Sequence, residues 1–599
     1  MSTQASVLNV SERLDKLYEF DREPIPTSKL YGGWHFAGLY AGECTAATEF
    51  VIGALFVMWG ASVFDIIVGL AIGNFLAMLS WTFFCAPIAT RTRLTLYWYI
   101  HKIGGPVFAF IYNISNAFLF CILTGTMITV SASAVRIPFG IPPQLNWYPT
   151  DIWFVLIVFL VGGVITALAI LGFKRLIQFA SVCAPWMIVM FVAGALVSLP
   201  VLGKASGIGQ ITTVSQLWDM ASTMVWTGKA TNPENQISFW HVMAFAWICD
   251  LAMNIGLSDM ALFRYARKAR YGLCTSTGMY LGHYVAWICA GIFGAGAALL
   301  VKKPLEQLDS GDIGYITLGM TGAIAVLLAG WTTANPVLYK QGLAVQAVTP
   351  NWPRWKVTAA VGAVTTVIAC FPFVFTKMLD FVALYGLLLL PVGAIVFAEY
   401  WIFPKIGLVR HWVSRQQKLM NWPALLTWVI SIALAMVLWY ANVLHLFFLF
   451  IPVWFLSIAL YIGLAAIGGA RKSSSEALEP VEEESKLPEV GQDPPGDVVA
   501  ARHPEETATK YKFSQRTTYD KVALILWGTV AILSLLVCLW MPVKVFLDGM
   551  ENYQANLVSF QKWIFLPTVI YFVTGTCWLI LKEKENESTA GSMSSNCAT

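Results

Sequence analysis

Long apolar stretches recur along almost the whole chain and constrain its fold more than any other feature. A helix needs about 20 apolar residues to cross the hydrocarbon core of a bilayer. Lipid offers the backbone no hydrogen-bond partners, so a spanning segment of this length must be helical. We therefore predict an all-α polytopic membrane protein with about fourteen spans. The predicted spans are 33–58, 63–88, 106–133, 152–172, 177–200, 239–262, 276–301, 315–338, 357–375, 380–403, 422–441, 444–468, 520–543 and 560–581.

The composition excludes a soluble protein and gives no case for a nucleic-acid partner. Hydrophobic residues make up 57% and charged residues 12% of the 599 residues, whereas a soluble domain carries about 25% charged residues. The net charge is only +4. Residues 1–31 are polar and charged, so we expect no cleavable signal peptide. The first span would then direct insertion into the cell membrane.

The cysteines are interpreted as small packing residues. Nearly all of the eleven lie inside apolar stretches, and none forms a CxxC motif or a Cys/His cluster. We therefore expect no disulfide framework, no metal held by cysteine and no cofactor. The chain also has no HExxH motif, no GxSxG motif with partners and no phosphate-binding loop, so we do not expect an enzyme.

The distribution of Lys and Arg predicts the orientation, because these residues accumulate on the cytoplasmic side of a membrane. With the N-terminus inside, 30 of the 38 fall in cytoplasmic segments, Lys340 among them. This alternation holds from span to span up to the twelfth. Both termini are therefore expected in the cytoplasm.

One linker divides the chain. Residues 469–518 are rich in Ser, Glu and Pro and lack an apolar period, which is typical of a disordered cytoplasmic segment. The linker follows a twelve-span core at 32–468 and precedes a two-helix hairpin at 519–582. A cytoplasmic N-tail at 1–31 and a C-tail at 583–599 complete the predicted organisation.

Two spans contain polar interruptions. The first carries the run AGECT at 41–45, and the sixth carries Asp250 followed by NIGLSD at 254–259. A broken helix exposes carbonyl groups that can bind cations and amide N–H groups that can bind anions. The alternative is that Gly42 and Gly256 only allow close packing of helices.

The interrupted spans are the first helices of two possible five-helix halves, 33–200 and 239–403. Interruptions at corresponding positions of inverted repeats point to a binding site near the middle of the membrane. We therefore expect a site between these two spans.

The acids inside the predicted spans are Glu43, Glu49, Asp250 and Glu399. A charge at the bilayer centre costs about 2.5–3.5 kcal/mol on insertion scales, so it usually serves a function. We place Asp250 in the site and expect Asp259 to pair with Arg264. Glu399 is either an interhelix partner or a residue near the cytoplasmic end. No Lys or Arg falls in the middle of the first twelve predicted spans, so buried acids must be protonated, bind a cation or find neutral donors.

The eighth span contains the polar motif GWTTANP at 330–336. Threonine can bond back to a carbonyl of its own helix, which is one interpretation of the two hydroxyls. The other is a Na+ site, in which hydroxyls of this motif and carbonyls of the broken first span supply hard oxygen ligands.

Five stretches resemble a known family in their order along the chain and in their spacing. They are GLAIGNFLAMLSW, CAPIATRTRLTLYWYIHKIGG, LGFKRLIQFASVCAPWM, FAWICDLAMNIGLSDMALFRYARK and LLAGWTTANPVLY. At these stretches the chain resembles the nucleobase–cation symporter-1 family, which includes purine–cytosine permeases and the hydantoin transporter. The resemblance covers residues 28–468 and implies a leucine-transporter-like 5+5 inverted repeat with broken helices 1 and 6, followed by two helices.

The resemblance also implies a sodium site. Its ligands would be the carbonyls of Ala41, Cys44 and Ala329 and the hydroxyls of Thr332 and Thr333. Both hydroxyl positions are suitably filled, which favours Na+ over H+ as the coupling ion.

A small-molecule site between spans 1, 3, 6 and 8 is the other implication. The two tryptophans that stack on the ring in the hydantoin transporter correspond to Leu123 and Asp250, and a glutamine of span 3 corresponds to Met127. An acid in place of a ring suggests a substrate with a cationic or strongly hydrogen-donating nitrogen. The remaining candidate contacts are Glu43, Thr45, Thr124, Trp247, Asn254 and Asn335.

The leading hypothesis is a secondary active transporter that couples Na+ or H+ to symport of a nucleobase or related small nitrogenous solute. A sodium/solute or betaine-type carrier of amino acids, amines or sugars has the same fold, but the inner loop after span 2 argues against it. A carrier-like substrate sensor, with the 470–518 segment recruiting partners, is the alternative of another class. The sequence favours no particular oligomeric state.

Overall fold

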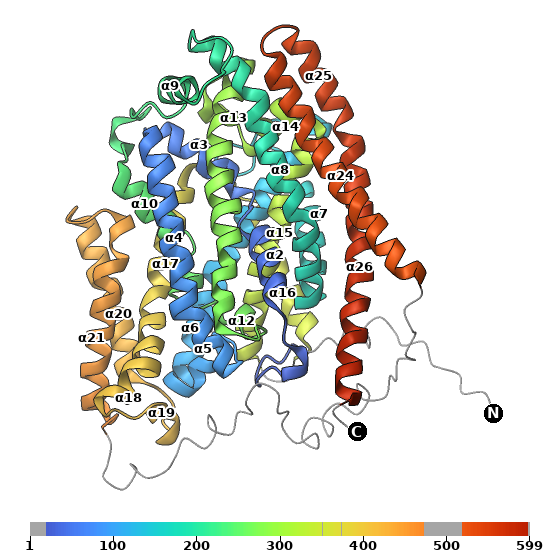
Figure 1. The fold of residues 1–599 in the computed structure, drawn as a ribbon. Helices are drawn as coiled ribbons and strands as arrows, with labels where there is room; N and C mark the ends of the chain where they lie inside the picture. Colours follow the sequence, from blue (N-terminus) through green and yellow to red (C-terminus); the bar gives the residue numbers. More distant parts are fainter. Residues whose placement is uncertain (1–18, 350–351, 373, 472–517, 597–599) are drawn as a thin grey trace.

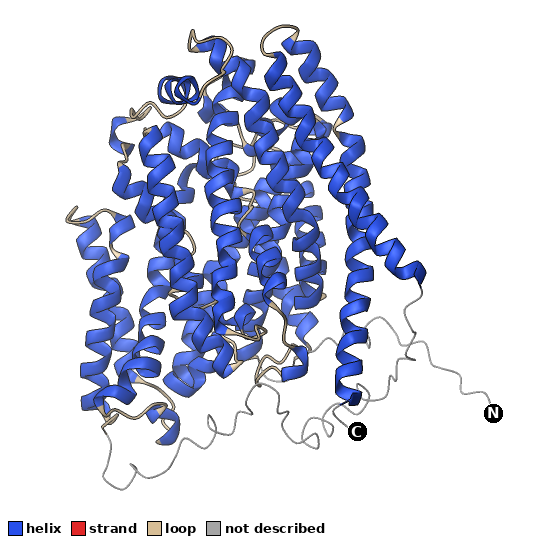
Figure 2. Cartoon of the chain, in the orientation of Figure 1, coloured by secondary structure: helices blue, strands red, loops and turns tan. Residues whose placement is uncertain are grey.

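The computed structural model describes residues 19–349, 352–372, 374–471 and 518–596. This part of the chain is a bundle of helices with three isolated β-bridges and no strand (Figures 1 and 2). Most of the predicted linker 469–518 and much of the predicted tail 1–31 lie outside the described residues, as does the end of the C-tail.

The first predicted repeat consists of seven α-helices. They are α2 (Gly33–Glu43), α3 (Thr48–Met58), α4 (Leu70–Ser80), α5 (Ala86–Thr92), α6 (Leu96–Val135), α7 (Ile152–Ile170) and α8 (Phe173–Ala205). Two π-helical turns, Asp65–Gly69 and Trp81–Cys85, complete the second span around α4 and α5.

The second predicted repeat follows an outer segment that contains α9 (Val214–Met224). Its helices are α10 (Phe239–Ile248), α11 (Leu251–Asn254), α12 (Met260–Phe263), α13 (Val285–Val301), α14 (Ser310–Leu318), α15 (Met320–Val348), α16 (Arg354–Ala369) and α17 (Val374–Phe397). A π-helical turn, Thr277–Tyr284, precedes α13, and another, Ala398–Ile402, follows α17.

The remaining helices lie beyond the two repeats. They are α18 (Phe403–Ile406), α19 (Trp412–Arg415), α20 (Trp422–Tyr440), α21 (Phe450–Gly468), α24 (Thr518–Asp548), α25 (Tyr553–Trp563) and α26 (Phe565–Asn596).

Eleven described helices are long and apolar enough to cross a membrane, or twelve if the bent pair α2 and α3 counts as one span. Two predicted spans fall outside this count. Span 239–262 is divided among α10, α11 and α12, and span 357–375 corresponds to α16, which has only 16 residues. The predicted all-α multi-pass class is confirmed, whereas the number of fourteen spans stays a prediction.

Both predicted interruptions are present. Helices α2 and α3 are bent by 56° across residues 44–47. The sixth span is interrupted after Ile248 and again between Asn254 and Met260, where Leu257 has a φ of +67°. A left-handed backbone is costly for a bulky residue and persists only where the surroundings fix it. Leu257 is fully buried, so the neighbouring helices supply that constraint.

Small residues let other helices close around the two breaks. A Cβ atom on Gly282 would lie 2.5 Å from the carbonyl oxygen of Cys44, and one on Gly393 would lie 2.2 Å from that of Ile255. Irregular backbone at membrane depth is tolerated where protein surrounds it. Gly42 instead lies within α2 and packs on α8, which is the close-packing role that the alternative interpretation gave it.

Helix α15 extends to Val348, well beyond the predicted end of the eighth span at 338. Lys340, which the orientation count placed in a cytoplasmic loop, is fully buried inside this helix. The expectation that no Lys or Arg lies in the middle of the first twelve spans is therefore wrong for the eighth span, where Lys340 is a basic partner of buried acids. Helix α15 packs against α6, α8 and α16, so its polar residues after Pro336 face protein rather than lipid.

The two C-terminal spans brace the fifth span. Helix α24 packs along both α26 and α8 (Figure 1). The indole Nε1 of Trp186 in α8 donates to Thr568 Oγ1 at 3.0 Å. The hydroxyl of Tyr571 donates to the carbonyl of Val182 at 2.7 Å. Directional hydrogen bonds of this kind fix the hairpin to one side of the core.

Replacement of Gly330 by Leu is expected to destabilise the bundle. A Cβ atom at Gly330 would lie 1.8 Å from Ser131 Oγ and 2.9 Å from the Met127 carbonyl oxygen, so α15 and α6 would have to separate. Overpacking of this kind costs about 1–3 kcal/mol or more, which thermal unfolding in detergent would report as a lower midpoint. Gly163→Leu is the matched control, because no atom lies within 4 Å of its Cβ position. Equal midpoints for the two variants would contradict this packing.

Candidate functional site

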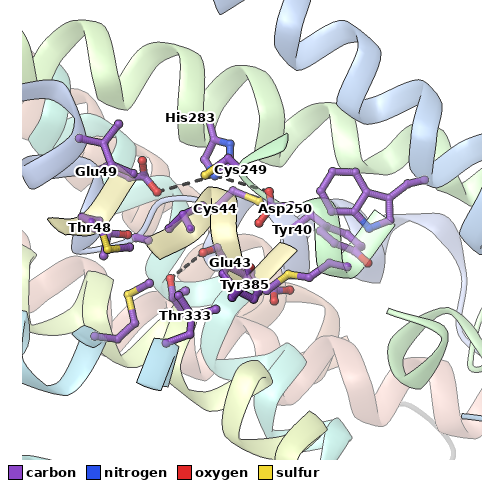
Figure 3. A pocket seen from close by; sticks show the side chains of 18 residues that line it. Tyr40, Glu43, Cys44, Thr48, Glu49, Cys249, Asp250, His283, Thr333 and Tyr385 are labelled. Carbon is purple, nitrogen blue, oxygen red and sulfur yellow. Dashed lines mark hydrogen bonds and ion pairs between the residues drawn. The ribbon is translucent and has the colours of Figure 1, made fainter. Parts of the chain in front are cut away.

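A small cavity lies where the two broken spans meet (Figure 3). About 40 Å³ of it is open to a water-sized molecule, which is room for a few waters and too little for a ring-shaped solute in this conformation. The lining residues are Tyr40, Glu43, Cys44, Ala46, Thr48, Glu49, Ile52, Trp81, Leu123, Met127, Cys249, Asp250, Met253, His283, Thr333, Met378, Val382 and Tyr385.

Lys340 forms a buried ion-pair network between the first, sixth and eighth spans. Its ammonium lies 3.0 Å from Glu43 Oε1 and 2.8 Å from Asp259 Oδ1, and none of the three residues is more than 4% exposed. Asp259 Oδ2 also accepts hydrogen bonds from Tyr40 OH at 2.7 Å and Trp81 Nε1 at 2.8 Å. Because an unpaired buried ion costs several kcal/mol, this network holds both breaks against α15.

The predicted pairing of Asp259 with Arg264 is wrong. The guanidinium of Arg264 donates to the backbone carbonyls of Glu19 and Phe20, both at 2.6 Å, and to Tyr339 OH at 3.1 Å. Proximity in the sequence suggested the pair. The two residues flank the single four-residue helix α12, which directs their side chains to different partners.

Glu399 is an interhelix partner, which was one of its two predicted roles. Its carboxylate accepts hydrogen bonds from the backbone N–H of His411 and from Tyr461 OH, both at 2.5 Å. It is not among the residues that line the cavity.

A second cluster on the cavity wall contains acids and a histidine. His283 Nε2 lies 3.7 Å from Glu49 Oε1 and 3.8 Å from Asp250 Oδ2, and both distances exceed a hydrogen bond. The imidazole stacks on Trp287, with ring centroids 4.5 Å apart and planes at 14°. Within the described part of the chain, no Lys or Arg forms an ion pair with Glu49 or Asp250. This side of the cavity therefore carries two carboxyl groups that no basic side chain of the described residues neutralises in an ion pair.

Three residues of the predicted sodium site lie where α15 meets the first break. Thr333 Oγ1 donates to the carbonyl of Glu43 at 2.6 Å and to that of Ala329 at 3.2 Å. Thr332 Oγ1 donates to the same Ala329 carbonyl at 3.1 Å. The hydroxyls thus bond back to their own helix, and one of them also joins α15 to the broken span.

The other two carbonyls predicted for the sodium site have different neighbours. The carbonyl of Ala41 accepts a hydrogen bond from Thr45 Oγ1 at 2.6 Å, so the Thr45 side chain is used within the first span. The carbonyl of Cys44 packs against Gly282 in the seventh span.

Four predicted substrate contacts line the cavity: Glu43, Leu123, Met127 and Asp250. They come from the first, third and sixth spans, as expected for a site between these helices. The structure thus brings these four residues to one cavity, and their role in binding a solute stays a prediction.

The other predicted contacts do not line the cavity. Thr124 Oγ1 accepts a hydrogen bond from Gln341 Nε2 at 2.7 Å. Trp247 Nε1 donates to Ser80 Oγ at 2.9 Å. Asn254 and Asn335 are buried, and each keeps one amide atom without a partner among the described residues.

Several lining residues were not sequence-derived candidates, and they include Tyr40, Trp81, His283 and Tyr385. His283 carried a usable signal, because it is an ionisable residue in the middle of predicted span 276–301. Tyr40 lies three residues before Glu43 in α2 and so shares its helix face. Trp81 and Tyr385 carried no signal, since aromatic residues are common in every span.

The chain resembles known proteins in structure, while no protein-family model and no curated protein sequence matches it. One solved structure is Mhp1, a nucleobase-cation-symport-1 family transporter, in a closed conformation with bromovinylhydantoin bound. It is 16% identical, with a TM-score of 0.58 over 77% of this chain and 99% of Mhp1. An inward-facing Mhp1 structure is 16% identical, with a TM-score of 0.57 over 80% of this chain and 100% of that one.

A third neighbour is a Na+-coupled sialic acid symporter in a substrate-bound, outward-open state. It is 14% identical, with a TM-score of 0.53 over 77% of this chain and 95% of the symporter. At such identities the likeness establishes the fold and not the solute. The predicted fold class, a leucine-transporter-like bundle with broken first and sixth spans, is confirmed.

Lys340→Met is expected to destabilise the protein by about 3–5 kcal/mol, because it leaves the buried carboxylates of Glu43 and Asp259 without a cation. Adding Glu43→Gln and Asp259→Asn should recover much of this loss, since no unpaired charge then remains. The free energy of unfolding in detergent is the measurement, and Lys303→Met, at an exposed position, is the control. Wild-type stability of Lys340→Met would contradict the structural role of the network.

Proposed function

We propose that this chain is a secondary active transporter that couples a cation to symport of a nucleobase or related small nitrogenous solute by alternating access. The observation that carries the proposal is a small, acid-lined cavity at the meeting point of two broken helices. Transporters with inverted repeats bind their substrate and coupling ion at such breaks. The hydantoin bound to Mhp1, a protein of the same fold, supports a cyclic nitrogenous solute as the first class to test.

Asp250 is the proposed anchor of the solute. Its carboxylate lines the cavity, and Oδ2 has no hydrogen-bond partner among the described residues. The rings of Tyr40, Trp81 and Tyr385 contribute to the same lining. Aromatic faces suit a flat ring or a cation, and a carboxylate suits N–H donors. This combination favours a solute that carries donor or cationic nitrogens on a small ring.

Na+ is the proposed coupling ion, with a site at Thr332 and Thr333. Their hydroxyls converge on the carbonyl of Ala329, and Thr333 also reaches the carbonyl of Glu43. Two hydroxyl and two carbonyl oxygens within hydrogen-bond distance of one another suit a hard monovalent cation. An ion that replaced these internal hydrogen bonds would join α15 to the first break and shape the adjacent solute site.

Alternating access would come from rocking of spans 1, 2, 6 and 7 against the other spans. Glu43 and Asp259 belong to the moving group, whereas Lys340 belongs to the eighth span. Each movement would therefore strain the buried ion pairs. By thermodynamic linkage, ion and solute would each tighten binding of the other by the same factor.

The Lys and Arg distribution supports cytoplasmic N- and C-termini for this transporter.

Asp250→Asn is expected to weaken solute binding by about 10–100-fold, because a charge-assisted hydrogen bond contributes about 1.5–3 kcal/mol. The solute is first found by thermal shift of the purified chain, with and without Na+, against nucleobases, hydantoins, vitamins and amines. Asp219→Asn, at an exposed position of α9, is the matched control. Unchanged affinity in Asp250→Asn would remove Asp250 from the site, and binding without uptake into proteoliposomes would indicate a sensor instead of a transporter.

Thr333→Val is expected to raise the Na+ concentration needed for half-maximal solute binding by about tenfold, because it removes an oxygen ligand of the proposed ion site. Thr321→Val is the control, since Thr321 is also buried in α15 and its hydroxyl has no partner among the described residues. Solute binding titrated against Na+ is the measurement. An equal Na+ requirement in both variants would place the coupling ion elsewhere.

A further inference from the structure

Three separate interruptions bring metal-ligating side chains to one wall of the cavity. Cys44 comes from the first break, Asp250 from the sixth span and His283 from the π-helical turn of the seventh span. One ligand atom from each of these residues lies within 4.8 Å of the others. Glu49, at the start of α3, joins them through its contact with His283.

The spacing of these atoms fits coordination better than hydrogen bonding. Around a tetrahedral ion with ligand bonds of about 2.1 Å, neighbouring ligand atoms are about 3.4 Å apart. His283 Nε2 lies 3.7 Å from Glu49 Oε1 and 3.8 Å from Asp250 Oδ2, and both contacts are drawn in Figure 3. An inward movement of Cys44, Asp250 and His283 would therefore bring one ligand atom of each to a common ion, with the Glu49 carboxylate beside His283.

Unpartnered polar atoms give a second, independent indication of a ligand. Glu49 is 2% exposed, and its Oε2 has no hydrogen-bond partner in the described chain. Asp250 Oδ2 also lacks a partner there, and its side chain is 14% exposed. His283 is 3% exposed, and its ring is held in place by Trp287. Buried carboxylates without partners are costly, so the cluster is built to receive positive charge.

The charge and the donor set together select a divalent transition metal. Lys340 already pairs with Glu43 and Asp259, and among the described residues no Lys or Arg forms an ion pair with Glu49 or Asp250. Two carboxylates exceed what a monovalent ion balances. Imidazole and thiolate are ligands that zinc-type ions prefer, whereas Na+ and Mg2+ favour oxygen alone. The available 40 Å³ suits an ion with a water.

We propose that Cys44, Glu49, Asp250 and His283 form a binding site for one divalent transition-metal ion of the zinc type. The thiol of Cys44 gives up its proton when the metal–sulfur bond forms. The site shares Asp250 with the proposed solute site but does not rest on it, so it is tested without solute and without a Na+ gradient.

The test is titration of the purified full-length chain, stripped with chelator, with Zn2+ and Co2+ in detergent. We expect one tight equivalent of Zn2+ by calorimetry, and a near-ultraviolet thiolate-to-cobalt charge-transfer band on addition of Co2+. Loss of a residue that only hydrogen-bonds to a metal ligand costs about 10–100-fold in metal affinity. Replacing a ligand itself, in His283→Gln, should therefore weaken Zn2+ binding at least about tenfold. Cys44→Ser should abolish the cobalt band.

Matched variants separate ligation from folding. Cys289→Ser removes another buried free cysteine of the seventh span, outside the cluster, and should keep both the stoichiometry and the cobalt band. Glu49→Gln provides a second ligand variant, and each variant is checked for a monodisperse, cooperatively unfolding protein without metal. The absence of a tight equivalent in the wild-type chain would overturn the site. Zn2+ affinities equal to that of the wild-type chain in well-folded His283→Gln and Glu49→Gln would also overturn it.

Discussion

The ammonium group of Lys340 is the constraint on which the centre of the bundle depends. It is removed from water inside α15 and is offset by Glu43 at the first break and by Asp259 beyond the second. The effective cost of desolvating such an ion is several kcal/mol, and close pairing must offset it. Both interrupted spans are therefore held to one cation, and neither can move away from Lys340 without breaking its ion pair.

This network divides the cavity into two electrostatic environments. Near α15, Lys340 pairs with Glu43 and Asp259, and Thr332 and Thr333 carry neutral hydroxyl oxygens. Toward the seventh span, Glu49 and Asp250 face His283 without a lysine or arginine in ion-pair contact among the described residues. Coulomb interactions are strong in such a low-dielectric setting. A neutral-oxygen ion site and an acidic binding surface can therefore lie within one small cavity.

The surrounding spans differ in how firmly they are held. Helix α8 is tied to the C-terminal hairpin by side-chain hydrogen bonds, which stabilise it as part of a scaffold. The second and seventh spans instead contain π-helical turns, at Asp65–Gly69, Trp81–Cys85 and Thr277–Tyr284. Such turns occur frequently at functional sites, and one of them carries His283. Trp81 and His283 from these turns line the cavity, whereas none of its lining residues comes from α8.

The sequence by itself determined the helical class, most span positions and the two breaks. Lipid cannot satisfy a bare backbone, so long apolar stretches must be helices and polar residues such as Glu43 and Asp250 stand out within them. The family resemblance added Leu123 and Met127 to the site, and both line the cavity. Tertiary structure alone decided the partners: Lys340 is predicted in a cytoplasmic loop, yet it pairs with acids from two other spans. Hydropathy cannot distinguish a helix face turned to lipid from one turned to protein, and residues far apart in the chain decide that difference.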